Sequence, residues 1–227
     1  MPQGAVALTI YSAMKITRYI IAIMLIATHA VAWAATDMGE VWEAIPQKLV
    51  PTIEPNRRMD MIDLYHAGQP ARAATLLGGE AEITAMGDNY IAVRLSTSST
   101  LQIKRIKTAK ETIYVTIHTL YAPAANSRIE IYDSRWQPLD THRYLPEIKT
   151  DDFVAPSVDK AQRREILTAV LIPTIEYTMN EASDDIAANA TFEQTLDADT
   201  YRSIAPDLLL HRTLQWNGSR WQLIAVE

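Results

Sequence analysis

Apolar residues between residue 37 and about residue 78 recur at intervals of three and four, as in amphipathic helices. Asp37 and Glu40 have the separation of a capping box, in which each side chain bonds the other residue's backbone N–H. The apolar residues that follow gather on one helical face. Pro46 ends the segment, because proline cannot continue the helical hydrogen bonds. A short first helix is therefore expected.

A second helix is predicted from about residue 54 to residue 67. Pro55 suits its first turn, and Gly68 follows its end. A third short helix is predicted over residues 70–77, because two glycines follow it directly and glycine commonly ends helices.

From Glu80 the pattern changes to a period of two, which predicts β-strands. Turn-like segments separate the strands, and these segments are too short to contain crossover helices. The strands should therefore form an antiparallel meander. The alternating apolar positions are Ile91, Val93, Leu95, Leu101, Ile103, Ile113, Val115, Ile117, Ile129 and Ile131.

The rest of the chain repeats a helix and strand order. Residues 141–159 alternate poorly and form the longest connection, after which a helix is predicted over residues 159–168. A hairpin follows, then a helical turn over residues 197–204. The chain ends in a second hairpin, for which Asn217-Gly218 is a strong turn signal.

These elements predict an α+β fold: short N-terminal helices packed on one face of an antiparallel meander sheet, with a second half of helix plus hairpins. We expect one domain over residues 35–227. Helix–strand–strand order recurs in residues 35–140 and 159–227, which suggests two similar halves, although their residues show no repeat.

Residues 1–34 have the composition of a signal peptide. Lys15 and Arg18 are their only lysine or arginine and no acid is present, and the apolar run 19–27 is followed by a small-x-small sequence that ends at Ala34. The apolar run is shorter than the ~20 residues that span a bilayer, which favours cleavage near Ala34 over a membrane anchor.

A cleaved leader predicts a periplasmic or secreted protein whose mature chain does not span a membrane. Met14 also begins a complete leader, so residues 1–13 have a second interpretation as the product of an upstream start codon. The choice between Met1 and Met14 stays open.

The mature chain is acidic and contains no cysteine. Removal of the leader takes away two of 21 basic residues and none of 27 acidic ones, which leaves a net charge of −8. Nucleic-acid binding needs a basic surface, so no nucleic-acid partner is expected. The absence of cysteine excludes thiol catalysis, cysteine-ligated zinc and disulfides.

Asp60, Asp63 and His66, at intervals of three, are the nearest approach to an acid–base site. At 100° per residue, Asp60 and Asp63 lie opposite the apolar arc of the second helix, whose first turns stabilise acids. No feature of the sequence places a second wall over them. We therefore interpret these acids as solvent-facing rather than catalytic.

No other motif indicates chemistry. The serines do not form a G-x-S-x-G elbow, the glycines do not form a phosphate-binding loop, and the histidines lack metal-ligand spacing. We predict no catalytic, cofactor-binding or metal-binding residues, and no cofactor. The histidines of the mature chain are His66, His118, His142 and His211.

Tyrosine and tryptophan are abundant, with ten and five residues against two phenylalanines. Such amphipathic aromatics suit partly wet contact surfaces for carbohydrate or protein. The alternative is that they pack across strands within the sheet. The alternative is favoured because Trp216 and Trp221 flank a hairpin in nearly opposed positions.

Several segments carry a resemblance to a family: Ala44-Ile45-Pro46, residues 56–63, Leu77-Gly78-Gly79 and the strand sequence EITAMGDNYIAVRLS. Together they resemble domain-of-unknown-function family 3256, uncharacterised exported proteins of Bacteroidales. The resemblance spans most of the mature chain and includes a Trp-Asn-Gly hairpin. It implies export and an α+β fold, and it implies no activity, cofactor or catalytic residue.

Two classes of function are consistent with these observations. The first is a non-enzymatic binding or assembly protein of the bacterial cell envelope, with an envelope protein or a glycan as partner. The second is an envelope hydrolase that acts on carbohydrate or peptide through Asp, Glu or His residues distant in the sequence. The first is favoured because no catalytic motif is present; the sequence indicates no oligomeric state.

Overall fold

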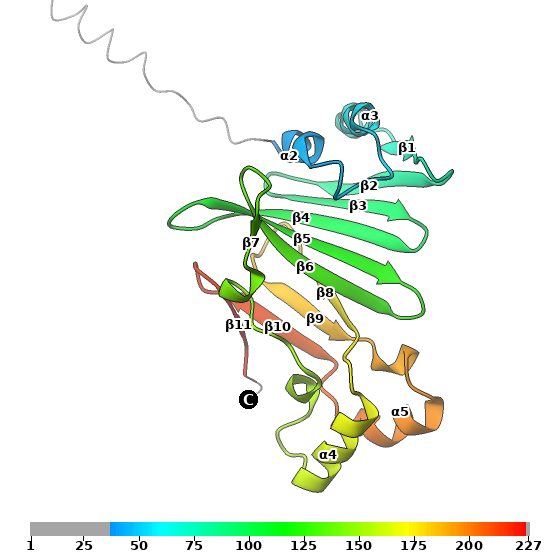
Figure 1. The fold of residues 1–227 in the computed structure, drawn as a ribbon, viewed down its shortest axis with the longest axis vertical. Coiled ribbons are helices and arrows are strands. Elements are labelled where there is room, and N and C mark those ends of the chain that lie inside the picture. Colours follow the sequence, from blue (N-terminus) through cyan, green and yellow to red (C-terminus); the bar gives the residue numbers. More distant parts are fainter. Residues whose placement is uncertain (1–36, 226–227) are drawn as a thin grey trace, which may run out of the picture. The chain divides into compact units, whose positions relative to one another are not determined.

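Two antiparallel β-sheets form the core of the protein in the computed structural model, which describes residues 37–225 (Figure 1). The large sheet has seven strands in chain order, and the small sheet has four, in the order β11-β10-β9-β8. The large-sheet strands are β1 (Arg72–Ala74), β2 (Glu80–Met86), β3 (Tyr90–Ser96), β4 (Ser99–Lys107), β5 (Thr112–Tyr121), β6 (Ala125–Asp133) and β7 (Pro138–Leu139). The small-sheet strands are β8 (Ile175–Thr178), β9 (Ile186–Ala190), β10 (His211–Trp216) and β11 (Trp221–Leu223).

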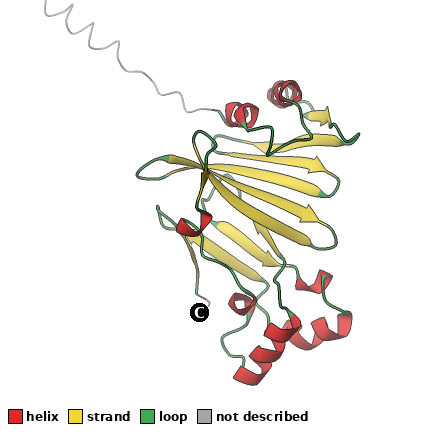
Figure 2. Ribbon diagram, in the orientation of Figure 1, coloured by secondary structure: helices red, strands yellow, loops and turns green. Residues whose placement is uncertain are grey.

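The helices lie in two groups. Figure 2 shows α2 and α3 beside the first strands of the large sheet, and α4 and α5 together at one end of the small sheet. The α-helices are α2 (Met38–Ala44), α3 (Pro55–His66), α4 (Lys160–Ala169) and α5 (Ala198–Ile204). Short 3₁₀ helices are η1 (Thr141–Arg143), η2 (Thr150–Phe153), η3 (Phe192–Gln194) and η4 (Ala205–Asp207).

The structure confirms the α+β fold and the antiparallel meander that the alternating pattern predicts. The C-terminal hairpin is also confirmed: Trp216 pairs with Trp221, and Gly218 adopts a φ of 91° in the turn between them. The two later helices agree with prediction, and Asp159 and Asp197 cap them through their side chains. The predicted leader, residues 1–34, lies outside the described residues.

The helix predicted over residues 70–77 is wrong. Residues 72–74 instead form β1, which pairs antiparallel with the edge of β2. Ala71 and Ala73 are buried while Arg72 and Ala74 are exposed, so the segment follows the period of a strand. A short apolar alternation beside an open sheet edge gains backbone hydrogen bonds as a strand, which the local sequence pattern could not show.

The predicted capping box at the first helix is also wrong. Asp37 occupies the N-cap position of α2, but its side chain makes no capping hydrogen bond. Its carboxylate Oδ2 lies 3.6 Å from His66 Nε2, at the end of α3. The second helix ends as predicted, at His66, and Gly68 follows with a φ of 68°.

Each face of the large sheet is covered by a different layer. Strand β4 shows the division: Leu101 and Ile103 join the core under α2 and α3, whereas Ile106 joins the core that includes the small sheet. The N-terminal helices α2 and α3 therefore pack on one face of the large sheet, as predicted. The second half of the chain forms a separate sheet that packs on the opposite face, which the sequence pattern did not indicate.

The buried side chain of Arg58, in α3, forms hydrogen bonds with the C-terminal end of α2. Nη1 donates to the carbonyl oxygens of Trp42 and Ile45, while Nη2 donates to Gln47 Oε1 at 3.3 Å. The C-terminal carbonyls of a helix have no partner within the helix, so the guanidinium supplies one to the end of α2. Burial lowers the pKa of Arg58.

Strand β8 lies at the edge of the small sheet, and side chains of the large sheet accept hydrogen bonds from the backbone along the side of β8 that does not pair with β9. Three backbone N–H groups at alternate positions, 175, 177 and 179, point toward the large sheet and each donates to a side-chain oxygen. An edge strand closed in this way offers no template for pairing with another chain. The three bonds run from Ile175 to Asn126 Oδ1 at 3.3 Å, from Tyr177 to Ser127 Oγ at 3.0 Å, and from Met179 to Gln102 Oε1 at 2.9 Å.

Arg58→Met should lower the free energy of unfolding by about 2–3 kcal/mol, because it leaves buried carbonyls without a charged donor. Arg57→Met is the matched control, since Arg57 is the neighbouring exposed arginine of the same helix. It should change stability by less than about 0.5 kcal/mol. Urea denaturation of both variants tests this, and equal effects would show that the buried guanidinium does not stabilise the helix pair.

Candidate functional site

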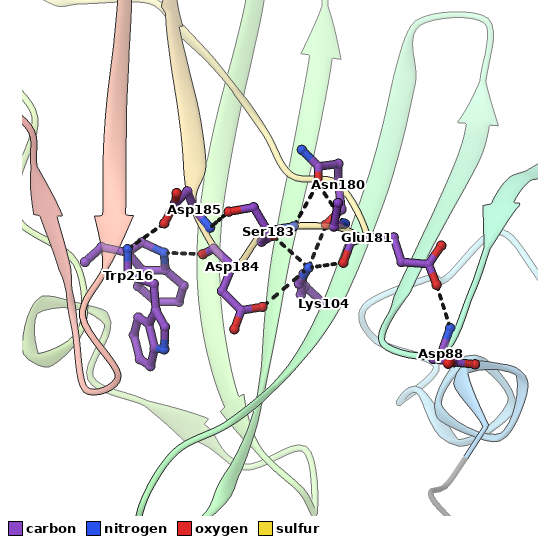
Figure 3. A network of polar contacts seen from close by, with 10 residues as sticks. Asp88, Lys104, Asn180, Glu181, Ser183, Asp184, Asp185 and Trp216 are labelled. Atoms are coloured by element: carbon purple, nitrogen blue, oxygen red, sulfur yellow. Dashed lines mark hydrogen bonds and ion pairs between the residues drawn. The ribbon is translucent and has the colours of Figure 1, made fainter.

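The ammonium group of Lys104 joins the two sheets (Figure 3). The Lys104 side chain is fully buried, and Nζ donates to the carbonyl oxygens of Asn180 at 2.6 Å, Glu181 at 3.0 Å and Ser183 at 2.7 Å. Asp184 Oδ1 lies 3.4 Å away and supplies a partial counter-charge. The loop between β8 and β9, residues 180–185, therefore wraps around a cation that projects from β4.

The same loop makes a further contact with the large sheet. Glu181 Oε1 accepts the backbone N–H of Asp88 at 3.0 Å, in the turn between β2 and β3. A Cβ atom at Gly87 would lie 2.0 Å from Glu181 Oε1, so a side chain at this position would displace the carboxylate.

The loop also contacts the C-terminal hairpin. Trp221 Nε1 donates to the carbonyl of Asp184 at 2.8 Å, and the backbone N–H of Trp216 donates to Asp185 Oδ1 at 2.8 Å. Lys104 is the buried centre of this network, whereas Glu181 and Asp88 are exposed and the Asp184 side chain is 40% exposed. Because the donors and acceptors are paired with one another, we interpret the network as structural.

The predicted acid pair lies on the surface, as its helical position indicates. Asp60 and Asp63 are both exposed, and Asp60 Oδ2 lies 3.7 Å from Arg57 Nη1. The sequence placed no second wall over these acids, and in the structure β1 brings Arg72 and Ala73 to the same shallow groove. The cause is the strand conformation of residues 72–74, which the pattern had assigned to a helix.

The four histidines are dispersed. His66 contacts Asp37, His118 lies on β5, His142 lies in η1, and His211 Nδ1 lies 2.9 Å from Asn189 Oδ1. No group of three or more histidine and acidic side chains in residues 37–225 has an arrangement that could hold a metal ion.

Most of the aromatic residues within residues 37–225 are buried, which agrees with the favoured interpretation. Tyr114 and Tyr132 pack on Trp136, with ring centroids 4.8 and 5.5 Å away. The rings of Trp216 and Trp221 are 4.4 Å apart across the hairpin. The aromatic excess is therefore largely explained by the core.

Two neighbouring aliphatic side chains, Leu171 and Ile172, project from the segment between α4 and β8. We call this pair the aliphatic tip. Leu171 is 80% exposed and Ile172 is 82% exposed. Exposed apolar side chains are ordinary by themselves, and Leu76 and Leu77 form another exposed pair. What makes Leu171 and Ile172 a candidate interaction site is that Leu171 also lines a hollow.

The segment that carries the aliphatic tip is fixed on both sides. Val170 is buried, and its carbonyl accepts a hydrogen bond from Thr150 Oγ1 at 2.9 Å. Beyond the tip, the carbonyl of Thr174 accepts the N–H of Thr191 at 3.0 Å. Pro173 favours an extended backbone at the residue before it. The tip is therefore held away from the core by its own connections.

A hollow of about 380 Å³, which we call the tip hollow, adjoins the aliphatic tip and includes Leu171 in its wall. Its rim is charged: Lys149 Nζ lies 3.4 Å from Glu147 Oε2, and Asp151 pairs with Arg163 of α4. A hollow with a partly apolar lining beside an apolar projection is a surface that can bind a partner with matching shape. The apolar lining residues are Ile148, Leu167, Val170, Leu171 and Pro173.

A second hollow, of about 560 Å³, lies beside α5. Burial raises the pKa of the Tyr201 hydroxyl, and the negative charge of Glu193 adds to the effect. Arg202 is held by Asp199 at 2.8 Å. None of the residues that line this hollow is a strongly exposed aliphatic side chain, so the tip hollow is the stronger candidate site.

The sequence interpretation missed the aliphatic tip. A signal was present, because Leu171 and Ile172 lie between the end of a predicted helix and a predicted strand and fit neither period. The proline that follows them marks the same break. Lys104 gave no such signal, since a lysine in an alternating strand is ordinarily an exposed residue.

A family model described as "Protein of unknown function (DUF3256)" matches residues 30–221, which include both sheets and the aliphatic tip. The chain belongs to this family. The resemblance found in the sequence is thereby confirmed. No curated protein matches the chain.

The fold of this family member is similar to that of a solved structure described as a domain of an uncharacterized protein from Porphyromonas gingivalis W83. The TM-score is 0.72 at 21% sequence identity, and the match covers 82% of this chain and 98% of that one. At this identity the similarity shows the fold alone. Within residues 37–225, no helix is both long and apolar enough to cross a bilayer.

Alanine at both Asp60 and Asp63 should leave the free energy of unfolding within about 0.5 kcal/mol of the native value, because both side chains are exposed. Binding to any envelope partner should also be unchanged. Thermal unfolding and a binding measurement on the double variant test this. A folded double variant that no longer binds would assign the groove beside β1 a functional role.

Proposed function

We propose that this protein is exported to the bacterial cell envelope and works there without catalysis, by binding another envelope protein through the aliphatic tip. The observation that carries the proposal is the exposure of Leu171 and Ile172, at 80% and 82%, beside a hollow with a partly apolar lining. The basic, apolar leader over residues 1–34 supports export, as does the resemblance to exported proteins of Bacteroidales.

The energetics favour a protein partner at this surface. Burial of a leucine or isoleucine side chain contributes roughly 1.5–3 kcal/mol relative to its exposed state. The two residues of the tip can therefore supply a large part of the free energy of a specific contact.

The rigidity of the tip adds to the affinity. Flexible loops lose conformational freedom when they bind, which weakens association. Val170 and Thr174 are already held by hydrogen bonds on either side of the tip, so little further ordering of the backbone is required. The tip is thus presented in a fixed conformation.

The test compares two double variants of the full chain, each expressed with an affinity tag in the source bacterium. Leu171→Ser with Ile172→Ser removes the apolar tip. Leu76→Ser with Leu77→Ser is the matched control, because those adjacent leucines are 62% and 84% exposed in the turn between β1 and β2.

The tip variant should recover at least about tenfold less cross-linked envelope protein than the native chain, since the lost burial exceeds 1.4 kcal/mol. The control variant should recover the same partner in unchanged amount. Equal recovery by all three proteins, or retention of the tagged chain in the cytoplasm, would refute the proposal.

A further inference from the structure

We infer that the partner bound by the aliphatic tip is a second copy of this chain, related to the first by a two-fold axis. This inference rests on the proposed function, because it identifies the partner at the same surface. In the resulting pair, the tip of each copy occupies the tip hollow of the other.

The first reason is shape. The aliphatic tip and the tip hollow adjoin one another, with Leu171 belonging to both. A two-fold contact uses the same patch on both molecules, so it needs a surface that is complementary to itself. A projection next to a hollow meets this condition, because rotation by 180° brings each projection to the other molecule's hollow.

The second reason is charge. Without residues 1–34 the chain carries a net charge of −8, so two copies repel each other over most of their surfaces. The rim of the tip hollow is balanced instead, with Glu147 and Asp151 against Lys149 and the adjoining Arg163. A second copy can approach this patch without net repulsion, and a two-fold contact can place Lys149 of one copy opposite Glu147 of the other.

The third reason is that β8 offers no free backbone edge to which a strand of another chain could pair. Proteins with open sheet edges often associate by strand addition. The outer N–H groups of β8 are already bonded to Asn126, Ser127 and Gln102. Association of two copies through side chains at the tip therefore does not compete with pairing at this strand.

The first experiment is sedimentation velocity on the purified protein, expressed as the full chain, over a range of concentrations. The native protein should form a dimer. Leu171→Ser with Ile172→Ser should raise the dimer dissociation constant more than about tenfold, and Leu76→Ser with Leu77→Ser should leave it unchanged.

The second experiment exchanges charges across the proposed two-fold axis. In a dimer of the Lys149→Glu variant, residue 149 of one copy and residue 147 of the other are both acidic. In a dimer of the Glu147→Lys variant, both are basic. Each variant alone should therefore dimerise at least about tenfold more weakly than the native protein. An equimolar mixture of the two variants should form a heterodimer close to native affinity. The internal pair between residues 147 and 149 is broken in both variants, so recovery on mixing reports a contact between copies.

Three results would overturn the inference. The first is a native protein that stays monomeric at all concentrations measured, and the second is a dimer that persists in the tip variant. The third is a mixture of the two charge variants that dimerises no more tightly than either variant alone. If envelope capture still depends on the tip when the native protein is monomeric, the partner is a different protein and the proposed function stands. If capture and dimer formation are both insensitive to the tip, both proposals fail.

Discussion

The structure depends on a buried ammonium group. Transfer of a cation from water to a protein interior costs several kcal/mol unless it is fully hydrogen-bonded. Lys104 meets this condition through three carbonyl oxygens and one carboxylate, which come from the loop between β8 and β9. The position of that loop therefore follows from the position of one lysine in the large sheet, and the small sheet is placed with it.

Further hydrogen bonds between the large sheet, the loop and the C-terminal hairpin lie close to Lys104. Gln102 lies two residues before Lys104 and accepts the N–H of Met179, which immediately precedes the loop. On the far side of the loop, Asp184 and Asp185 bond the C-terminal hairpin. Hydrogen bonds of this kind have direction, so they fix the angle between the sheets, which apolar packing alone leaves less defined.

Much of the fold follows from local pattern. Alternation and turn residues predict β2 to β6 and the last hairpin, because each depends on neighbouring residues alone. Strand β1 could not be predicted in this way, since residues 72–74 become a strand only by pairing with β2. The buried positions of Arg58 and Lys104 depend on carbonyl groups far away in the sequence, whereas a charged residue in a periodic segment ordinarily indicates a solvent-exposed position.

The same limit applies to the candidate site. The exposure of Leu171 and Ile172 results from hydrogen bonds to Thr150 and Thr191, which local periodicity does not connect with them.

The most direct test of this account is the free energy of unfolding of Lys104→Met, measured by urea denaturation beside Lys107→Met. Lys107 ends the same strand and is exposed, so it controls for loss of a lysine from β4. We expect Lys104→Met to lose about 3 kcal/mol, because buried carbonyls lose a charged donor, and Lys107→Met to change by less than about 0.5 kcal/mol. Equal stability of the two variants would contradict the claim that this ammonium group holds the two sheets together.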